Sequence, residues 1–158
     1  MFVRPLTTNE RAENPGFTHH VRITADDLTQ ATANTAQTFN AFPILKGDVI
    51  WRAMAIPVVP FQNTGDAAFN SDTVSVGDGG SATRYTAATE ANANGTYLPA
   101  IGNTAFLYTA ADNLVITVNS MAAKSLVNIN RGEYHVLVQL FRSTDLTNAI
   151  AKARINKP

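Results

Sequence analysis

Apolar residues in this chain recur in short alternating runs, and nearly every run is closed by a turn of Gly, Asn, Asp or Pro. Alternation places successive side chains on opposite faces of a strand, whereas a helix needs a spacing of three or four residues. The pattern predicts about seven to nine strands and almost no helix. Such a chain is expected to fold as an antiparallel β-sandwich of jelly-roll or similar type, and a barrel is the alternative that the same pattern allows.

The strongest predicted strand covers residues 49–59, VIWRAMAIPVV. Both of its faces are mostly apolar, so we expect the strand to be covered on both sides. Arg52 is the charged exception and needs a partner. Pro57 and Pro60 lack a backbone donor, which predicts that the strand ends at a sheet edge or contains a bulge.

The remaining segments predict a single domain with one extension at each end. Residues 1–16 are polar and show neither period, which predicts an extended N-terminal arm, followed by a sandwich domain over 17–142 and a C-terminal tail or short helix over 143–158. One or two helical turns are expected at 25–32, where Thr24 can cap a first turn that contains acidic residues. Further strands are expected at 18–24, 35–45, 74–77, 105–108, 114–119, 126–129 and 133–141.

The composition limits the classes of function that fit this chain. The 158 residues suffice for one domain with a core, and charged residues make up 15% against roughly 25% in an average globular domain. A surface so poor in charge suits a protein covered by neighbours, although compositional drift explains it equally well. The net charge of zero argues against a nucleic-acid partner, and no apolar run approaches the roughly 18 residues that span a membrane. Without cysteine or a leader segment, neither disulfides nor secretion is expected.

No pattern of catalytic or metal-binding residues emerges. His19 and His20 are neighbours on a predicted strand and point to opposite faces, so they cannot chelate one ion, and His135 stands alone on the last strand. Asp66, Asp72 and Asp78 lie in or beside loops, but the spaced oxygen ligands of a calcium loop are missing. The sequence also lacks a phosphate-binding lysine motif and a nucleophile elbow. We therefore expect no enzymatic activity, no cofactor and no metal.

The most distinctive segment is 73–97, where a short strand stops at the turn GDGG and a second turn, Asn94-Gly95, closes the block. Glycine supplies the backbone freedom of a tight turn, and the aspartate can bond to nearby backbone groups. Arg84 and Tyr85 follow this turn. An ion pair of Arg84 with a nearby acid and packing of Tyr85 is the favoured interpretation, and contact with a partner is the alternative.

Several short motifs appear in a fixed order: TADDL at 24–28, the long apolar strand, VSVGDG at 74–79 followed by Arg84-Tyr85, YTAAD at 108–112, and GE at 132–133. Over about residues 20–141 this order resembles a family of small structural proteins of tailed-phage virions. Some members of that family are head decoration or cement proteins built on a sandwich fold.

The resemblance implies a non-enzymatic capsid decoration or cement protein, made in the host cytoplasm and placed on the head surface of the virion. Its expected partners are the major capsid protein and other copies of itself, with a homotrimer favoured on a three-fold lattice site. The candidate contact residues are Phe2, Arg4, Pro5, Arg11, Arg84 and Tyr85. The alternatives are a tail or neck component and a carbohydrate-binding module whose aromatic residues would be Phe61, Phe69, Tyr85 and Tyr97.

Overall fold

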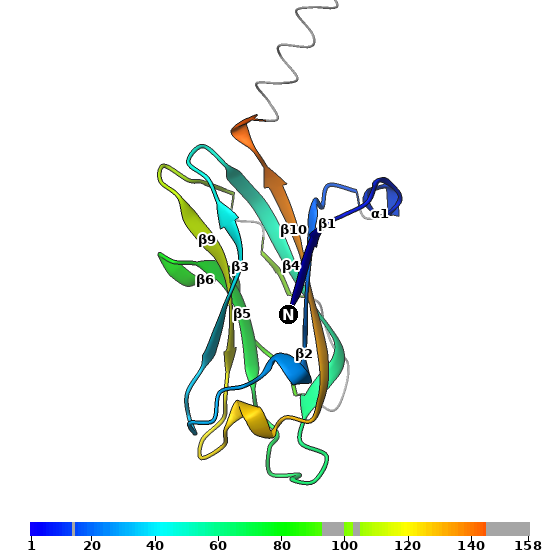
Figure 1. Cartoon of the computed structure of the whole chain (residues 1–158), viewed down its shortest axis with the longest axis vertical. Helices are drawn as coiled ribbons and strands as arrows, with labels where there is room; N and C mark the ends of the chain where they lie inside the picture. Colours follow the sequence, from blue (N-terminus) through cyan, green and yellow to red (C-terminus); the bar gives the residue numbers. More distant parts are fainter. Residues whose placement is uncertain (14, 93–99, 103–104, 145–158) are drawn as a thin grey trace, which may run out of the picture.

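Two antiparallel β-sheets face each other in the computed structural model (Figure 1), which describes residues 1–13, 15–92, 100–102 and 105–144. One sheet has six strands in the order β1-β2-β10-β4-β7, with β8 also paired to β4, and the other has the order β3-β9-β5-β6. The strands are β1 (Phe2–Pro5), β2 (His19–Thr24), β3 (Gln37–Ile44), β4 (Val49–Gln62), β5 (Thr73–Asp78), β6 (Ser81–Glu90), β7 (Ala100–Gly102), β8 (Phe106–Leu107), β9 (Asp112–Asn119) and β10 (Arg131–Phe141).

The strand pairs are nested around the β5–β6 hairpin. β4 pairs with β7 and β8, β3 pairs with β9, and β2 pairs with β10, always antiparallel. The chain therefore behaves as one long hairpin whose successive pairs are rolled into opposite sheets, which is the jelly-roll topology. The expected fold class is confirmed. The barrel alternative is not realised, because the described strands form two separate sheets.

The core lies between the sheets and is built from the alternating positions of the strands. In β9 the predicted inward residues Leu114, Ile116 and Val118 are fully buried. In β10 the inward row runs from Tyr134 to Leu140, with no member more than 4% exposed. Alternation along single strands was therefore enough to identify the residues that hold the two sheets together.

Strand β4 is covered on both faces along its middle, as expected, whereas its residues Trp51 and Val58 are 54% and 48% exposed. Its inner residues Ala53 and Ala55 belong to the core, while its outer residues Met54 and Ile56 pack against a small second cluster formed by Leu6, Phe17 and Leu137. The strand runs past both prolines to Gln62, and the register with β10 shifts beyond Pro57. The predicted bulge is confirmed.

Arg52 finds its partner in the N-terminal segment: its guanidinium lies 4.5 Å from the centre of the Phe17 ring and donates a hydrogen bond of 3.2 Å to the Pro15 carbonyl. The cation is therefore covered by an aromatic face rather than by a carboxylate.

Three local expectations need correction. The segment 1–16 is not extended throughout: Phe2–Pro5 adds an edge strand to β2, but Thr8–Glu13 forms the short helix α1 (Figure 1). The helical turns expected at 25–32 are reduced to a single 3₁₀ turn, η1 (Ala25–Asp27). The strand expected at 126–129 is a second 3₁₀ turn, η2 (Leu126–Asn128), whose Leu126 side chain is fully buried in the core.

The turn at Asn94-Gly95 and most of the predicted C-terminal tail, from residue 145 onward, lie outside the described residues. Within the described part of the chain, no helix has the length and apolar character that a membrane span requires.

Candidate functional site

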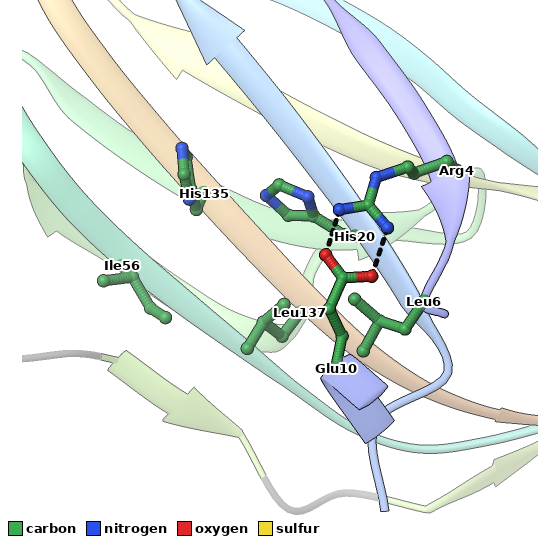
Figure 2. Close-up of a pocket in the computed structure, with 7 residues that line it drawn as sticks. All are labelled: Arg4, Leu6, Glu10, His20, Ile56, His135 and Leu137. Carbon is green, nitrogen blue, oxygen red and sulfur yellow. Dashed lines mark hydrogen bonds and ion pairs between the residues drawn. The ribbon is translucent and has the colours of Figure 1, made fainter. Parts of the chain in front are cut away.

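Three of the candidate contact residues, Arg4, Arg84 and Tyr85, belong to two side-chain clusters in different parts of the molecule. The hairpin cluster lies at the β5–β6 turn and consists of Asp78, Arg84, Tyr85, Phe106 and Tyr108. The N-terminal cluster lies on the outer face of the six-stranded sheet and consists of Arg4, Leu6, Glu10, His20, Ile56, His135 and Leu137 (Figure 2). Each cluster contains one arginine–carboxylate pair.

The hairpin cluster begins with the backbone of its turn. One oxygen of Asp78 accepts hydrogen bonds from the backbone N–H groups of Gly80, at 3.0 Å, and Ser81, at 2.8 Å. A side chain at position 77 would overlap the backbone of Ser81 and Ala82, so only glycine fits there. These contacts explain the GDGG sequence as turn chemistry, without an ion.

The second oxygen of Asp78 binds two side chains. It forms an ion pair with Nε of Arg84 and accepts a hydrogen bond of 2.8 Å from the Tyr108 hydroxyl. Asp78 is only 2% exposed. Burial alone would raise the pKa of Asp78, but the bonds from Arg84, Tyr108 and Ser81 outweigh it and hold the pKa below its usual value. The carboxylate is therefore charged, and both of its oxygens are bonded to groups of the protein.

Two tyrosines extend this network into the core. The hydroxyl groups of Tyr85 and Tyr108 lie 2.5 Å apart, and both side chains are buried. Burial raises the pKa of Tyr85 to about 12, so this hydroxyl stays protonated at neutral pH. The Arg84 guanidinium lies 3.8 Å from the centre of the Phe106 ring. The favoured interpretation is confirmed: Arg84 pairs with a nearby acid, and Tyr85 packs inside the single chain.

The N-terminal cluster is held by an ion pair between β1 and α1. Arg4 bonds both carboxylate oxygens of Glu10 (Figure 2). Glu10 also accepts hydrogen bonds from the backbone N–H of Thr7, at 2.8 Å, and from its hydroxyl, at 2.7 Å. The bond from Arg4 is the main reason that the pKa of Glu10 lies far below its usual value. Glu10 thus fixes the start of α1 and ties it to the edge strand.

Two histidines from neighbouring strands form the other side of this cluster. The His20 and His135 rings meet edge to face with their centres 4.7 Å apart. Burial, and then the nearby His135, lowers the pKa of His20. His19 points the other way and stacks on Phe42, with ring centres 4.9 Å apart, which confirms that the adjacent histidines leave opposite faces. No group of three metal-binding side chains occurs among the described residues.

The side chains of the N-terminal cluster enclose an open pocket of about 210 Å³ (Figure 2). Its floor is aliphatic, from Leu6, Ile56 and Leu137, and its charged rim is the Arg4–Glu10 pair. A pocket of this size is below the range of most small-molecule sites. Its chemistry suits a single side chain of a protein partner better than a substrate.

The other predicted contact residues of the N-terminal segment are at the surface. Phe2 is 52% exposed, Pro5 is exposed, and Nε of Arg11 donates a 3.2 Å hydrogen bond to the Leu6 carbonyl. Sequence analysis missed Glu10 and Tyr108 as members of the clusters. The Thr7-x-x-Glu10 spacing could have signalled a helix start, but the sequence held no signal that joins Tyr108 to Asp78.

The aromatic residues proposed for a carbohydrate site do not form one. Phe61, Phe69 and Tyr85 are at most 3% exposed, and Tyr97 lies outside the described residues. A sugar-binding platform needs exposed aromatic faces, so these three residues are corrected to core positions.

Comparison with known proteins yields one structural match to report. No protein-family model matches the chain, and no curated protein matches it. A chain of the solved structure "Cyanophage Pam1 capsid asymmetric unit" is similar in fold, with a TM-score of 0.50 and 27% sequence identity over 77% of this chain and 79% of that chain. Because the two covered shares are nearly equal, the two chains are close in length.

Proposed function

We propose that the protein is a non-enzymatic structural component of a phage virion, and specifically a decoration or cement protein that bridges major capsid subunits on the head surface. The observation that carries the proposal is the structural match to a chain of a cyanophage capsid asymmetric unit, which extends over most of both chains. The jelly-roll topology agrees with it, because this fold is common in viral capsid proteins, although fold alone does not determine function.

The two clusters support a structural role by their chemistry. Both oxygens of Asp78 are hydrogen-bonded inside the protein, and its partner Tyr108 and the adjoining Tyr85 are buried. Neither cluster presents a nucleophile beside a base, which a hydrolase would need. A rigid sandwich with a low surface charge is suited to being held between neighbours.

Contact with the capsid is assigned to the N-terminal segment. Strand β1 is the last strand of its sheet and pairs on one side with β2. Its other edge can accept a strand from a partner. The candidate contact residues near this edge are Phe2, Arg4, Pro5 and Arg11. Arg84, at the rim of the hairpin cluster, adds a separate contact with the capsid. A homotrimer would place three such edges around a three-fold lattice site.

The first test locates the protein on the particle. Antibodies against the purified protein are applied to intact particles of the phage that encodes it, and gold labels are imaged by electron microscopy. Labels spread over the head are expected. Labels at the tail or neck would replace the proposal with the tail-component alternative, and particles without label would overturn both.

The second test concerns the contact residues. Particles that lack the protein are incubated with purified wild-type protein or with the Arg4→Ala/Arg11→Ala variant, and bound protein is measured after sedimentation. Weaker binding of the variant is expected. Deletion of residues 1–16 is less suitable, because it also removes β1 and the buried side chain of Leu6. Arg131→Ala is the matched control, since Arg131 is an exposed arginine at the start of β10, six residues along that strand from Leu137, which is level with Arg4 across His20.

A further inference from the structure

Two imidazole rings lie in contact on the outer face of the six-stranded sheet, beside β1 and α1 of the N-terminal segment. Figure 2 shows the His20 ring between His135 and the Arg4–Glu10 pair. The ring centres of His20 and His135 are 4.7 Å apart, and His20 lies opposite Arg4 in the register of β2 with β1. A change in the charge of His20 therefore acts directly on the contact between the N-terminal segment and the sheet.

The His135 ring has a partner for a positive charge. Its Nε2 lies 2.7 Å from Oε1 of Glu133, which also accepts a 2.8 Å hydrogen bond from Nε of Arg22. The bond from Arg22 is the main reason that the pKa of Glu133 is lowered to about 2. Glu133 is therefore ionised above about pH 4 and can only accept, so Nε2 of His135 donates to it. A further proton on this ring stays beside a carboxylate.

The His20 ring has no comparable partner. Its Nε2 has almost no accessible surface and no hydrogen-bond partner among the described residues. In a histidine cation both ring nitrogens carry a proton, so this nitrogen would become a buried donor without an acceptor. Such a group costs free energy in the folded protein, whereas water satisfies it once the site is open. The surroundings of His20 therefore suit the neutral ring.

The charged groups that face His20 are mostly cations or groups that become cations in acid. They are Arg4 from β1, Glu10 from α1, Arg22 from β2 itself, and His135 from β10 with Glu133 bonded to it, while β4 adds the apolar Ile56 to this pocket. Both oxygens of Glu10 already bond to Arg4. Burial, and then the nearby His135, lowers the pKa of His20 from its ordinary value of 6.5, which agrees with the geometry of the site.

We propose that protonation of His20 loosens β1 and α1 from the six-stranded sheet, so that the attachment of the N-terminal segment depends on pH. When the segment opens, water reaches His20, which then takes up a proton near pH 6.5. While the segment is attached, His20 resists the proton. The open form therefore binds more protons below about pH 6.5, and a fall in pH favours the open form. This inference is independent of the proposed virion function.

Hydrogen exchange of the full-length protein tests the proposal. Protection factors, corrected for the intrinsic pH dependence of exchange, are measured at about pH 7.5 and about pH 5.5, and those of β1 and α1 are divided by those of β9 in the other sheet. In the wild type this ratio should fall several-fold in acid, with a limit of about ten-fold for one group that titrates near pH 6.5. The ratio should not change in His20→Gln, which cannot take up a proton. His19→Gln is the matched control and should behave like the wild type, because His19 points to the opposite face and stacks on Phe42.

A second measurement needs no variant: the imidazole signals of the wild type are titrated by nuclear magnetic resonance, and His20 should titrate below its ordinary value. Titration of His20 at or above that value would overturn the proposal. An equal ratio at the two pH values in the wild type, or the wild-type loss in His20→Gln, would overturn it as well. Absence of the protein from the phage head would contradict the proposed function but would leave this inference intact.

Discussion

The hairpin cluster and the N-terminal cluster are built around the same pair of side chains, an arginine and a carboxylate, but the pairs differ in their surroundings. The Asp78 side chain is 1% exposed, whereas that of Glu10 is 31% exposed. Both carboxylates have a pKa below the usual value. The low pKa of Asp78 arises although the carboxylate is buried, which by itself would raise the pKa. The low pKa of Glu10 arises in a carboxylate that is partly open to water.

This difference assigns the two pairs to different tasks. If the hairpin pair is broken, water cannot replace the lost partner of a buried charge, and the turn, the tyrosines and the sheet end are all affected. If the N-terminal pair is broken, water solvates both charges, and little stability is lost. The hairpin cluster is therefore an internal anchor. The Arg4–Glu10 pair of the N-terminal cluster lies at the surface, where its two charged side chains can change with little loss of stability.

The largest effect is expected from Asp78→Ala. The substitution leaves the Arg84 guanidinium, the Tyr108 hydroxyl and two backbone N–H groups without their acceptor. We expect the free energy of unfolding to fall by about 3–5 kcal/mol, measured by urea denaturation. Glu10→Ala is the matched control; it removes a surface ion pair and the two bonds from Thr7 at the start of α1, and should lower the stability much less than Asp78→Ala. Similar losses in both variants would contradict the division into anchor and surface.

A third carboxylate, that of Asp72, shows the effect of burial without an ion pair. Asp72 directly precedes β5 and is fully buried. No described group meets hydrogen-bond geometry with either oxygen, although the Asn92 amide lies close enough to oppose part of the pKa shift that burial causes. The nearby amide of Asn92 donates to the carbonyls of Phe61, at 2.6 Å, and Phe69, at 2.9 Å. Burial raises the pKa of Asp72 to about 7. Between about pH 4 and 7, the Asp72 carboxyl is therefore protonated in the folded protein but ionised in the unfolded chain, where its pKa is 3.8.

Asp72→Asn should therefore stabilise the protein at high pH. The folded state binds more protons than the unfolded state between about pH 4 and 7, so wild-type stability falls as the pH rises through this window. The neutral amide removes that dependence. We expect a gain of roughly 2–4 kcal/mol at pH 8 and almost none at pH 4, from urea denaturation at both pH values. Parallel pH profiles of the two proteins would show that Asp72 is not the titrating group.

The N-terminal segment depends on apolar contact more than on its ion pair. Leu6 is 7% exposed and packs with Phe17 and Leu137. We expect Leu6→Ala to lower the free energy of unfolding by about 2 kcal/mol, and to speed hydrogen exchange mainly in β1 and α1. Phe2→Ala removes an exposed side chain and should change stability by less than about 0.5 kcal/mol. Fast exchange spread over the whole sandwich in Leu6→Ala would contradict a locally attached segment.

The parts predicted well from sequence are those whose signal is local. Alternation identified the buried residues Leu114, Ile116 and Val118 because one strand in a sandwich needs one apolar face. β1 was missed because FVRP is too short and mixed to alternate, and it becomes a strand when β2 offers an open edge. The short apolar run at 126–129 resembles a strand, but its leucine fills the end of the core. The Tyr108–Asp78 bond joins residues 30 positions apart, and only the nested strand pairing brings them together.

The smallest effect on stability is expected from Arg4→Ala, and this makes the substitution useful. Arg4 loses its bond to Glu10, but both groups lie at the surface and water can replace the bond. We therefore expect a midpoint of thermal unfolding within about 1 °C of the wild type, measured by calorimetry. Arg84→Ala, which takes the cation from buried Asp78, should lower the midpoint by several times more. If Arg4→Ala leaves the fold intact, weaker binding of an Arg4 variant to capsids reports a lost contact rather than a damaged protein. If Arg4→Ala lowers the midpoint as strongly as Arg84→Ala, the N-terminal ion pair is part of the anchor, and the comparison between the two clusters fails.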